Sequence, residues 1–199
     1  DRTRKGRIEL NGKVVQITSP EKAVKLGIGF VPEDRKAQGV LMGRSVRENM
    51  SLPLLRRISR FLFLDQKKEE EMILEYKDAL NIKTPSLGQL LKNLSGGNQQ
   101  KVVIGKWLAG SVQILILDEP TQGIDVGTKH EIYQMMNQLT ARGISIIMIS
   151  SEMEEMLGMS DRIIVLHEGC AAGTLDNKNK FTQEKIMELA SGEGGLATC

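Results

Sequence analysis

Three short runs of apolar residues stand in the second half of this 199-residue sequence, and they restrict its fold strongly. The runs are Ile114–Leu117, Ile144–Ile149 and Ile163–Leu166. Runs that are apolar at almost every position are typical of strands buried on both faces, as in a parallel sheet. A stripe at helical spacing lies between the first two runs and comprises Ile132, Met135, Met136 and Leu139. Alternating strands and helices predict a parallel α/β sheet with core helices.

The residues before these runs predict two further regions. Asn11-Gly12 lies between two β-like runs and indicates a hairpin, Ser19-Pro20 indicates a helix start, and Ile28–Val31 indicates a buried strand. A helical pattern follows, with one helix expected over Gln99–Leu108. We expect one incomplete domain over residues 1–199 in four parts: a β segment at 1–44, a helical subdomain at 45–110, an α/β core at 111–175, and a C-terminal helix and tail at 176–199.

Two adjacent carboxylates, Asp118 and Glu119, follow the first apolar run. The carboxyl ends of parallel strands form the edge of a sheet at which ligands bind. A carboxylate there can hold Mg²⁺ through water, and a second can orient or deprotonate an attacking water. A strand end capped by solvated acids before a proline turn gives the same pattern, so this motif alone leaves both interpretations open.

A second motif is the glycine-rich loop Leu94-Ser95-Gly96-Gly97-Asn98-Gln99, which precedes a predicted helix. Two glycines let backbone amides approach a phosphate closely, the serine hydroxyl adds a donor, and the helix offers its positive end to an anion. A glycine-rich loop without a ligand is the alternative for this motif by itself. The loop and the acidic strand end occur in this order with one helix between them, and such a combination rarely arises by chance.

Together the two motifs resemble the ATP-binding cassette (ABC) ATPase family, over Arg7–Gly173. Residues 94–99 are similar to the signature loop of that family, Ile114–Asp118 to its Walker B strand, Glu119 to its catalytic carboxylate, and Gly123–Asp125 to its D-loop.

This resemblance implies a P-loop NTPase-like α/β fold, here partial, with a parallel sheet, a helical subdomain and an N-terminal β segment. It implies ATP and Mg²⁺ as cofactors, with Asp118 holding the metal through water. It also implies that the nucleotide is contacted by Ser95, Gly96, Gly97, Asn98, Gln99 and Asp125.

The sequence departs from the family pattern at three places. No G-x-x-x-x-G-K-[ST] loop is present, and because the family carries this phosphate loop upstream, we expect an N-terminal truncation. Glu33 replaces the glutamine of the family's Q-loop, and Ser151 replaces its switch histidine. A carboxylate repels the γ-phosphate, and serine cannot act as a cationic donor. We expect the chain to be inactive as an isolated fragment.

The form Asn98-Gln99-Gln100-Lys101, with Glu33-Asp34-Arg35-Lys36, is most similar to the second half of the fused double ATPases of bacterial monosaccharide importers. This implies an ATPase of ribose-, galactose- or xylose-type uptake whose signature loop acts in trans on ATP held by the other half. The implied partners are an N-terminal ATPase half, transmembrane permease subunits and, indirectly, a periplasmic or lipid-anchored sugar-binding protein. The implied location is the cytoplasmic face of the bacterial plasma membrane.

Two other functions fit the same signature. One is a DNA-repair or chromosome-associated ATPase lobe, but the net charge of +2 and the lack of long heptads count against it, and we expect no nucleic acid partner. The other is a non-catalytic nucleotide-sensing module, which Glu33, Ser151 and the missing phosphate loop favour. Asp118 and Glu119 argue for some catalytic use.

Two segments each allow two interpretations. Arg56, Arg57 and Arg60 precede the apolar Phe61–Leu64, which indicates either a surface that contacts a membrane or permease, or a solvated helix face beside a core segment. The glycine-rich Ser191–Cys199 is either a native tail or a second cut end.

Overall fold

The computed structural model describes residues 6–60, 63–110, 112–176, 178 and 181–192. The chain forms two compact units, Asp1–Met148 and Ile149–Cys199. The four-part division expected from the sequence stays a prediction. Among the described helices, none combines the length and the apolar character that crossing a membrane requires.

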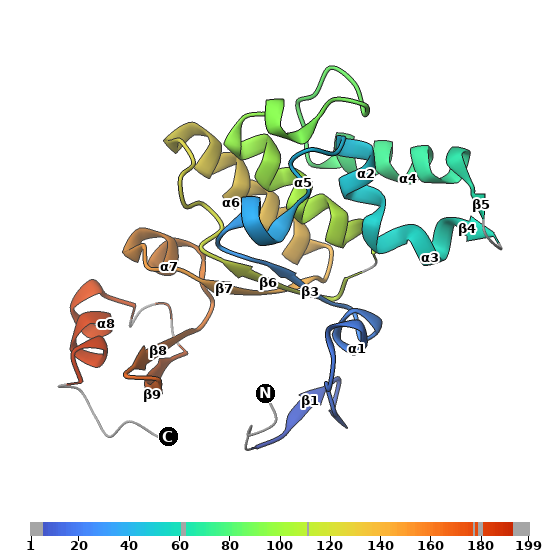
Figure 1. Cartoon of the computed structure of the whole chain (residues 1–199). Coiled ribbons are helices and arrows are strands. Elements are labelled where there is room, and N and C mark those ends of the chain that lie inside the picture. The colour runs from blue at the N-terminus through green and yellow to red at the C-terminus, as the bar shows by residue number, and fades with distance from the viewer. Residues whose placement is uncertain (1–5, 61–62, 111, 177, 179–180, 193–199) are drawn as a thin grey trace. The chain divides into compact units, whose positions relative to one another are not determined.

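The first unit contains most of the elements (Figure 1). It begins with β1 (Ile8–Leu10), β2 (Lys13–Val15), α1 (Pro20–Lys25), β3 (Ile28–Val31) and η1 (Arg35–Gly39). The mainly helical part follows, with α2 (Val46–Ser51), η2 (Leu52–Leu54), α3 (Leu55–Ile58), β4 (Ser59–Arg60), β5 (Phe63–Leu64), α4 (Gln66–Ala79), η3 (Leu91–Asn93) and α5 (Gly96–Ala109). It continues with β6 (Ile114–Asp118), α6 (Val126–Ala141) and β7 (Ser145–Ile149), which ends at the boundary with the second unit.

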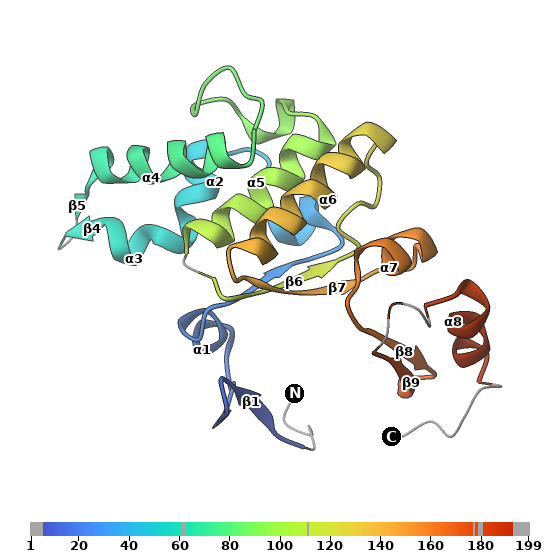
Figure 2. The same cartoon turned by 180° about the vertical axis from the view of Figure 1, so that it is seen from behind.

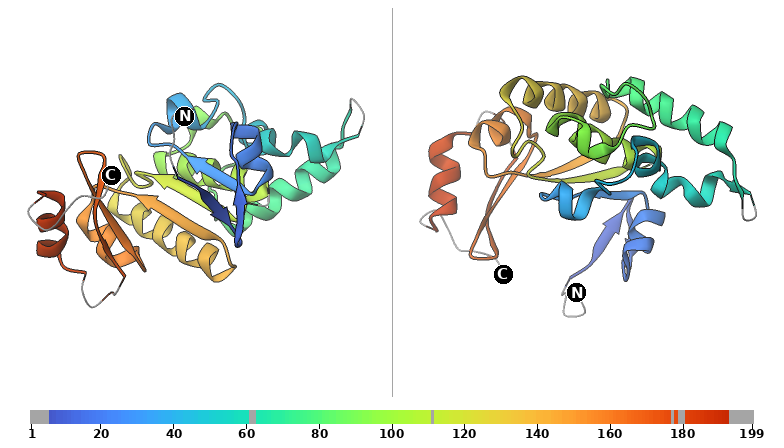
Figure 3. Two further views of the ribbon diagram at one scale, coloured as in Figure 1. Left: turned by 90° about the horizontal axis from the view of Figure 1, so that it is seen from below. Right: turned by 45° about the horizontal axis from the view of Figure 1, so that its top comes forward.

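The central sheet has the strand order β3-β6-β7, and Figure 3 shows the three strands side by side. Strand β3 runs parallel to β6, with Val31 opposite Leu117. The carboxyl ends of these two strands therefore lie at one edge, and Glu33 and Glu119 each follow two residues after this pair. The predicted parallel α/β sheet is confirmed for these strands.

Helices α5 and α6 cover one face of this sheet (Figure 2). Val31, Leu115 and Leu117 are fully buried on that face. On the opposite face Phe30 is 43% exposed and Ile147 is 52% exposed. The expectation that these strands are buried on both faces is wrong at Phe30 and Ile147, because α5 and α6 cover only the other face.

The region predicted to be helical contains α2, α3, α4 and α5. Helix α2 begins with a capping box, in which Ser45 Oγ accepts from Glu48 N at 3.2 Å and Ser45 N donates to Glu48 Oε2 at 2.8 Å. Such a box satisfies two backbone donors that the helix start leaves unpaired. The side chains of Arg56, Arg57 and Arg60, and residues 61–62, lie outside the described residues, so the predicted contact surface there stays a prediction.

The second unit contains α7 (Met153–Met159), β8 (Ile163–His167), β9 (Cys170–Leu175) and α8 (Gln183–Ala190). Strand β8 pairs antiparallel with β9 and forms a separate two-stranded sheet. The prediction that the third apolar run joins the parallel sheet is therefore wrong. The predicted last helix is confirmed, with Thr182 as its N-cap, whereas residues 193–199 of the tail lie outside the described residues.

Candidate functional site

The glycine-rich loop forms the start of α5, and Ser95 is the N-cap of this helix. The helix begins at Gly96, three residues before the predicted Gln99. Ser95 Oγ accepts from Asn98 N at 3.4 Å and from Asn98 Nδ2 at 2.9 Å. A hydroxyl can accept two hydrogen bonds and donate one, so these contacts leave its proton available to an incoming acceptor. The exposed Ser95 and the first amides of α5 thus form a surface able to bind an anion.

Asn98 and Gln99 hold this loop in place from within the protein. Asn98 Oδ1 accepts from Lys83 N at 2.7 Å, while its Nδ2 group donates to Ser95. Gln99 is only 5% exposed, and its Nε2 group donates to the carbonyls of Leu91 at 3.3 Å and Leu94 at 3.0 Å. The structure therefore places Gln99 beneath the loop, and the nucleotide contacts predicted for these two residues stay predictions.

Gly97 allows α5 to approach the start of α6. A Cβ atom placed on Gly97 would lie 2.0 Å from Thr128 Cγ2, a separation that real side chains do not adopt. Thr128 is itself held by Asp125, the N-cap of α6, whose Oδ1 accepts from Thr128 N at 3.0 Å and whose Oδ2 accepts from Thr128 Oγ1 at 2.8 Å. The backbone hydrogen bond from Thr128 is the main cause that lowers the pKa of Asp125 below its ordinary value. Asp125 thus stays ionised and fixes the D-loop to α6.

The two carboxylates of the predicted Walker B motif lie at the carboxyl end of β6. Asp118 is the last residue of the strand, and Glu119 adopts a φ of 44°, in the left-handed region. For a residue with a side chain this conformation costs about 1 kcal/mol or more. The backbone therefore turns sharply at Glu119.

The described residues include no group of three or more His, Cys, Asp or Glu side chains placed to bind a metal ion. The residues at the strand end fit one water-mediated contact to Mg²⁺, from Asp118, and not a complete magnesium site.

Glu33 is joined to Gln122, the residue before the predicted D-loop, by contacts that the sequence did not reveal. Gln122 Nε2 donates to Glu33 Oε1 at 3.1 Å, and Arg35 Nη1 donates to the carbonyl of Gln122 at 3.2 Å. Arg35 also reaches the signature loop, since a Cβ on Gly96 would lie 3.0 Å from Arg35 Nη2. The only sequence signal for this cluster was the acidic and basic run after the first sheet strand.

Ser151 belongs to the second unit and is exposed. Its neighbour Ser150 donates from Oγ to Glu155 Oε2 at 2.7 Å and accepts from Glu152 N at 3.0 Å. These bonds order the turn before α7. The role predicted for Ser151 beside the nucleotide stays a prediction.

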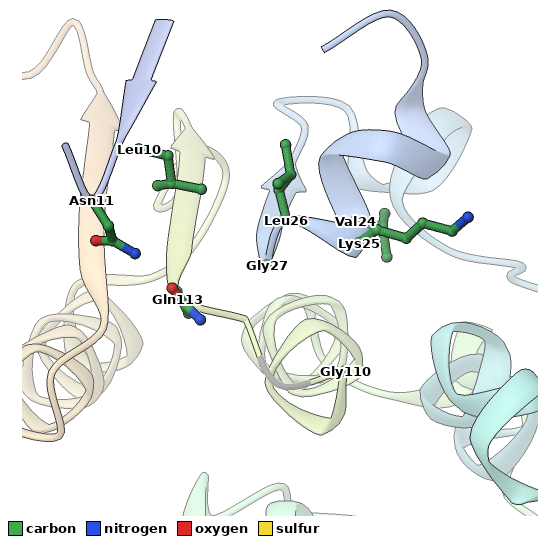
Figure 4. Close-up of a pocket in the computed structure, with 8 residues that line it drawn as sticks. All are labelled: Leu10, Asn11, Val24, Lys25, Leu26, Gly27, Gly110 and Gln113. Atoms are coloured by element: carbon green, nitrogen blue, oxygen red, sulfur yellow. The ribbon is translucent and has the colours of Figure 1, made fainter. Parts of the chain in front are cut away.

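A pocket of about 470 Å³ lies at the opposite end of the strands (Figure 4). Gly27 and Gln113, which precede β3 and β6, line it together with the hairpin residues Leu10 and Asn11. Figure 4 shows the Lys25 side chain extending away from these residues. The predicted site residues Glu33, Asp118 and Glu119 lie at or just after the carboxyl ends of β3 and β6, so this edge of the sheet remains the candidate site.

An ion pair between a buried lysine and a partly exposed glutamate links the two helices of the site. Lys101 of α5 is 3% exposed, and its Nζ donates to Glu131 Oε2 of α6 at 2.7 Å and to the carbonyl of Asn81 at 3.2 Å. The hydrogen bond from Lys101 is the main cause that lowers the pKa of Glu131. A carboxylate with a lowered pKa stabilises the fold above its ordinary pKa, here 4.5, and this stabilisation is lost as the pH falls through the lowered value.

We expect Glu131→Gln to lower the free energy of unfolding by about 1.5 kcal/mol at pH 7, because Lys101 loses its charged acceptor. The difference from the parent protein should shrink as the pH falls below 4.5. Urea denaturation from pH 7 to pH 3 measures both. Lys83→Gln is the control: its Nζ lies 3.7 Å from the same carboxylate at an exposed position, so its effect should stay under about 0.5 kcal/mol. A Glu131→Gln difference that does not vary with pH would contradict this role.

Comparison with known proteins identifies the family and the fold of the chain. The sequence profile described as ABC transporter matches residues 1–122. The chain is 51% identical to the ribose import ATP-binding protein of Bacillus licheniformis over 187 residues, which are 94% of this chain and 38% of that protein. It is 51% identical to the protein of the same name from Bacillus subtilis over 192 residues, which are 96% of this chain and 39% of that protein. The chain thus spans well under half the length of these curated relatives.

Solved structures show the same fold. An ATP-binding cassette of an ABC transporter matches with a TM-score of 0.78 at 20% identity, covering 93% of this chain and 76% of that cassette. Another cassette, solved as a dimer in a post-hydrolysis state bound to ADP and Pi, matches with a TM-score of 0.71 at 22% identity, covering 86% of this chain and 73% of that one. The predicted ABC ATPase fold, as a partial domain, is confirmed.

Proposed function

The chain belongs to the ABC transporter ATP-binding family, and we propose that it provides one wall of a shared ATP site in a monosaccharide importer. In this proposal Ser95 and the first amides of α5 contact the γ-phosphate of ATP held by a second ATPase half. The observation that carries it is the exposed, capped start of α5, which Arg35 links through Gln122 to Glu33 beside the predicted D-loop.

The residues of this wall act by position and charge. Transfer of a phosphoryl group depends almost wholly on positioning and electrostatic stabilisation. ATP supplies the phosphoryl group whose transfer to water releases the free energy for transport. The Ser95 hydroxyl donates a hydrogen bond to a phosphate oxygen, and the start of α5 adds its positive helix end. Asn98 and the Asp125 cap keep these donors in place.

Asp118 and Glu119 would serve a second site. Glu119 would accept a proton from the attacking water, and its backbone turn sets the direction of the carboxylate. Asp118 would contact Mg²⁺ through water. The carboxylate of Glu33 repels the γ-phosphate, and Ser151 lacks the positive charge that a histidine provides, so this second site is slow or silent. These two residues also favour the alternative of a non-catalytic nucleotide-sensing module.

The partners follow from the relatives. Because these are named ribose import ATP-binding proteins, the transported substrate is proposed to be ribose or a related monosaccharide. The N-terminal ATPase half would complete the shared site, as supported by the dimeric form of a cassette with the same fold. Permease subunits would place the assembly at the cytoplasmic face of the membrane, with a sugar-binding protein acting outside. The relatives give no support to a DNA-repair role.

An exchange experiment tests this proposal. In the Bacillus subtilis relative, the 192-residue segment that matches is replaced by this chain, and ATP-dependent ribose uptake is measured in cells that lack the native protein. We expect uptake well above the level of cells without the chimera. A chimera that accumulates to normal levels and binds the permease but supports no uptake of ribose, galactose or xylose would contradict the proposal.

A further inference from the structure

Arg35 reaches into the candidate site from an unexpected element. It is the first residue of η1, the short helix after β3, whose start is held by Asp34 Oδ1 accepting from Lys36 N and Ala37 N, both at 3.0 Å. This cap fixes the backbone from which the Arg35 side chain extends. The side chain of Arg35 is partly buried, and its Nε atom is buried without a hydrogen-bond partner.

The guanidinium joins two loops that are far away in sequence. Its Nη1 group donates to the carbonyl of Gln122, just before the D-loop, at 3.2 Å, over a separation of 87 residues. Its Nη2 group is so close to Gly96 that a Cβ atom there would lie 3.0 Å from it. Arg35 therefore touches the signature loop and the segment before the D-loop at the same time.

Gln122 is bonded to both Arg35 and Glu33. Its main-chain carbonyl accepts from Arg35, and its side-chain Nε2 donates to Glu33 Oε1 at 3.1 Å. Glu33 and Arg35 stand two residues apart after one strand, so this short segment holds Gln122 at two points. A displacement of the segment after β3 then carries the D-loop segment and the signature loop with it.

Helix stability does not explain the position of this arginine. A cation near the N-terminus of a helix is unfavourable, because the helix dipole places positive charge there. Lysine could keep the charge but presents a single ammonium in place of two fixed donor groups. The planar fork of the guanidinium is what reaches Gln122 and Gly96 together.

We propose that Arg35 is a positioning residue that couples the segment after β3 to the signature loop and to Gln122 beside the D-loop, so that these segments move as one body when the signature loop closes on the shared nucleotide. This inference rests on the proposed function. Arg35 touches no reacting atom; it acts through Gly96 and Gln122. Its loss therefore affects the closed state more than the first binding of ATP, which is made by the other half.

The test uses the chimera with Arg35→Gln, Arg35→Lys and, as the matched control, Lys36→Gln, which removes an exposed cation from the next position. We expect Arg35→Gln to lower kcat for ATP hydrolysis by about tenfold with KM changed less than about twofold, because binding precedes closure. Arg35→Lys should recover less than half of kcat, and Lys36→Gln should match the parent. A kcat within twofold of the parent in Arg35→Gln, or an equal loss in Lys36→Gln, would overturn the positioning role.

Amide hydrogen exchange of the 199-residue chain gives a second readout that does not need activity. Amides at 95–98 and 122–124 should exchange about tenfold faster in Arg35→Gln than in Lys36→Gln, while those at 132–139 in α6 stay the same. Equal exchange in the two variants would overturn the coupling. Ser95→Arg in the same chimera separates the two proposals: an active Ser95→Arg chimera refutes the shared site itself, whereas an inactive one beside a normal Arg35→Gln refutes only the role of Arg35.

Discussion

Ser95→Arg in the chimera is expected to abolish ATP-dependent ribose uptake and to lower ATP hydrolysis by about 100-fold or more. Loss of a single preorganised donor to a developing negative charge costs a factor of this order. Arginine also removes the N-cap acceptor for Asn98 and places a long side chain where the phosphate would approach. The measurement is steady-state ATPase activity of the purified chimera with its permease.

The control for this change is Ser86→Arg. Ser86 is exposed, and its contact within the preceding loop is made by its main-chain carbonyl, which accepts from Thr84 Oγ1 at 2.8 Å. The same change in charge and size there should leave ATPase activity within about twofold. Substantial activity in Ser95→Arg, or an equal loss in Ser86→Arg, would contradict the role given to Ser95.

Gly97→Ala is expected to lower the free energy of unfolding by about 2 kcal/mol and to weaken ATPase activity with it. Overpacking of this kind costs about 1–3 kcal/mol, and the new Cβ would lie only 2.0 Å from Thr128 Cγ2. Intrinsic propensity works in the opposite direction, since alanine is favoured over glycine in a helix by about 1 kcal/mol. A loss of stability therefore reports the contact between α5 and the start of α6.

The double variant Gly97→Ala with Thr128→Ser is the decisive comparison. Serine removes Cγ2 but keeps the hydroxyl that donates to Asp125 at 2.8 Å. We expect the double variant to regain more than half of the lost stability in urea denaturation, with a coupling free energy above about 1 kcal/mol. Additive effects of the two changes would show that Gly97 is not required for this close approach.

The sequence predicted the elements of the site well where the signal is local. Asp125 and Ser95 are N-caps, and both stand before helices whose starts are marked by hydrogen-bonding side chains. The apolar run ending in Asp118 forms β6, as expected from its lack of polar positions. These features depend on neighbours within a few residues, so a single sequence contains them.

Two features depend on contacts distant in sequence and could not be predicted. The apolar Ile147 suggested a strand buried on both faces, but burial also depends on which helices reach the second face, and a strand's own residues do not contain that information. Arg35 and Gln122 carry no motif that marks them; their contact spans 87 residues and exists only because β3 and β6 are neighbours. The antiparallel pairing of β8 likewise depends on β9, which follows it through a tight turn.

The central claim is that this chain contributes its signature loop to ATP held elsewhere. The most direct test is the rate of ATP hydrolysis by the 199-residue chain alone and after mixing with the amino-terminal half of the Bacillus subtilis relative. We predict that the mixture hydrolyses ATP about 100-fold faster than the chain alone and faster than the sum of its parts, because the donors from α5 act only on a phosphate bound by the other half. An equal rate for the chain alone and for the mixture would contradict the account.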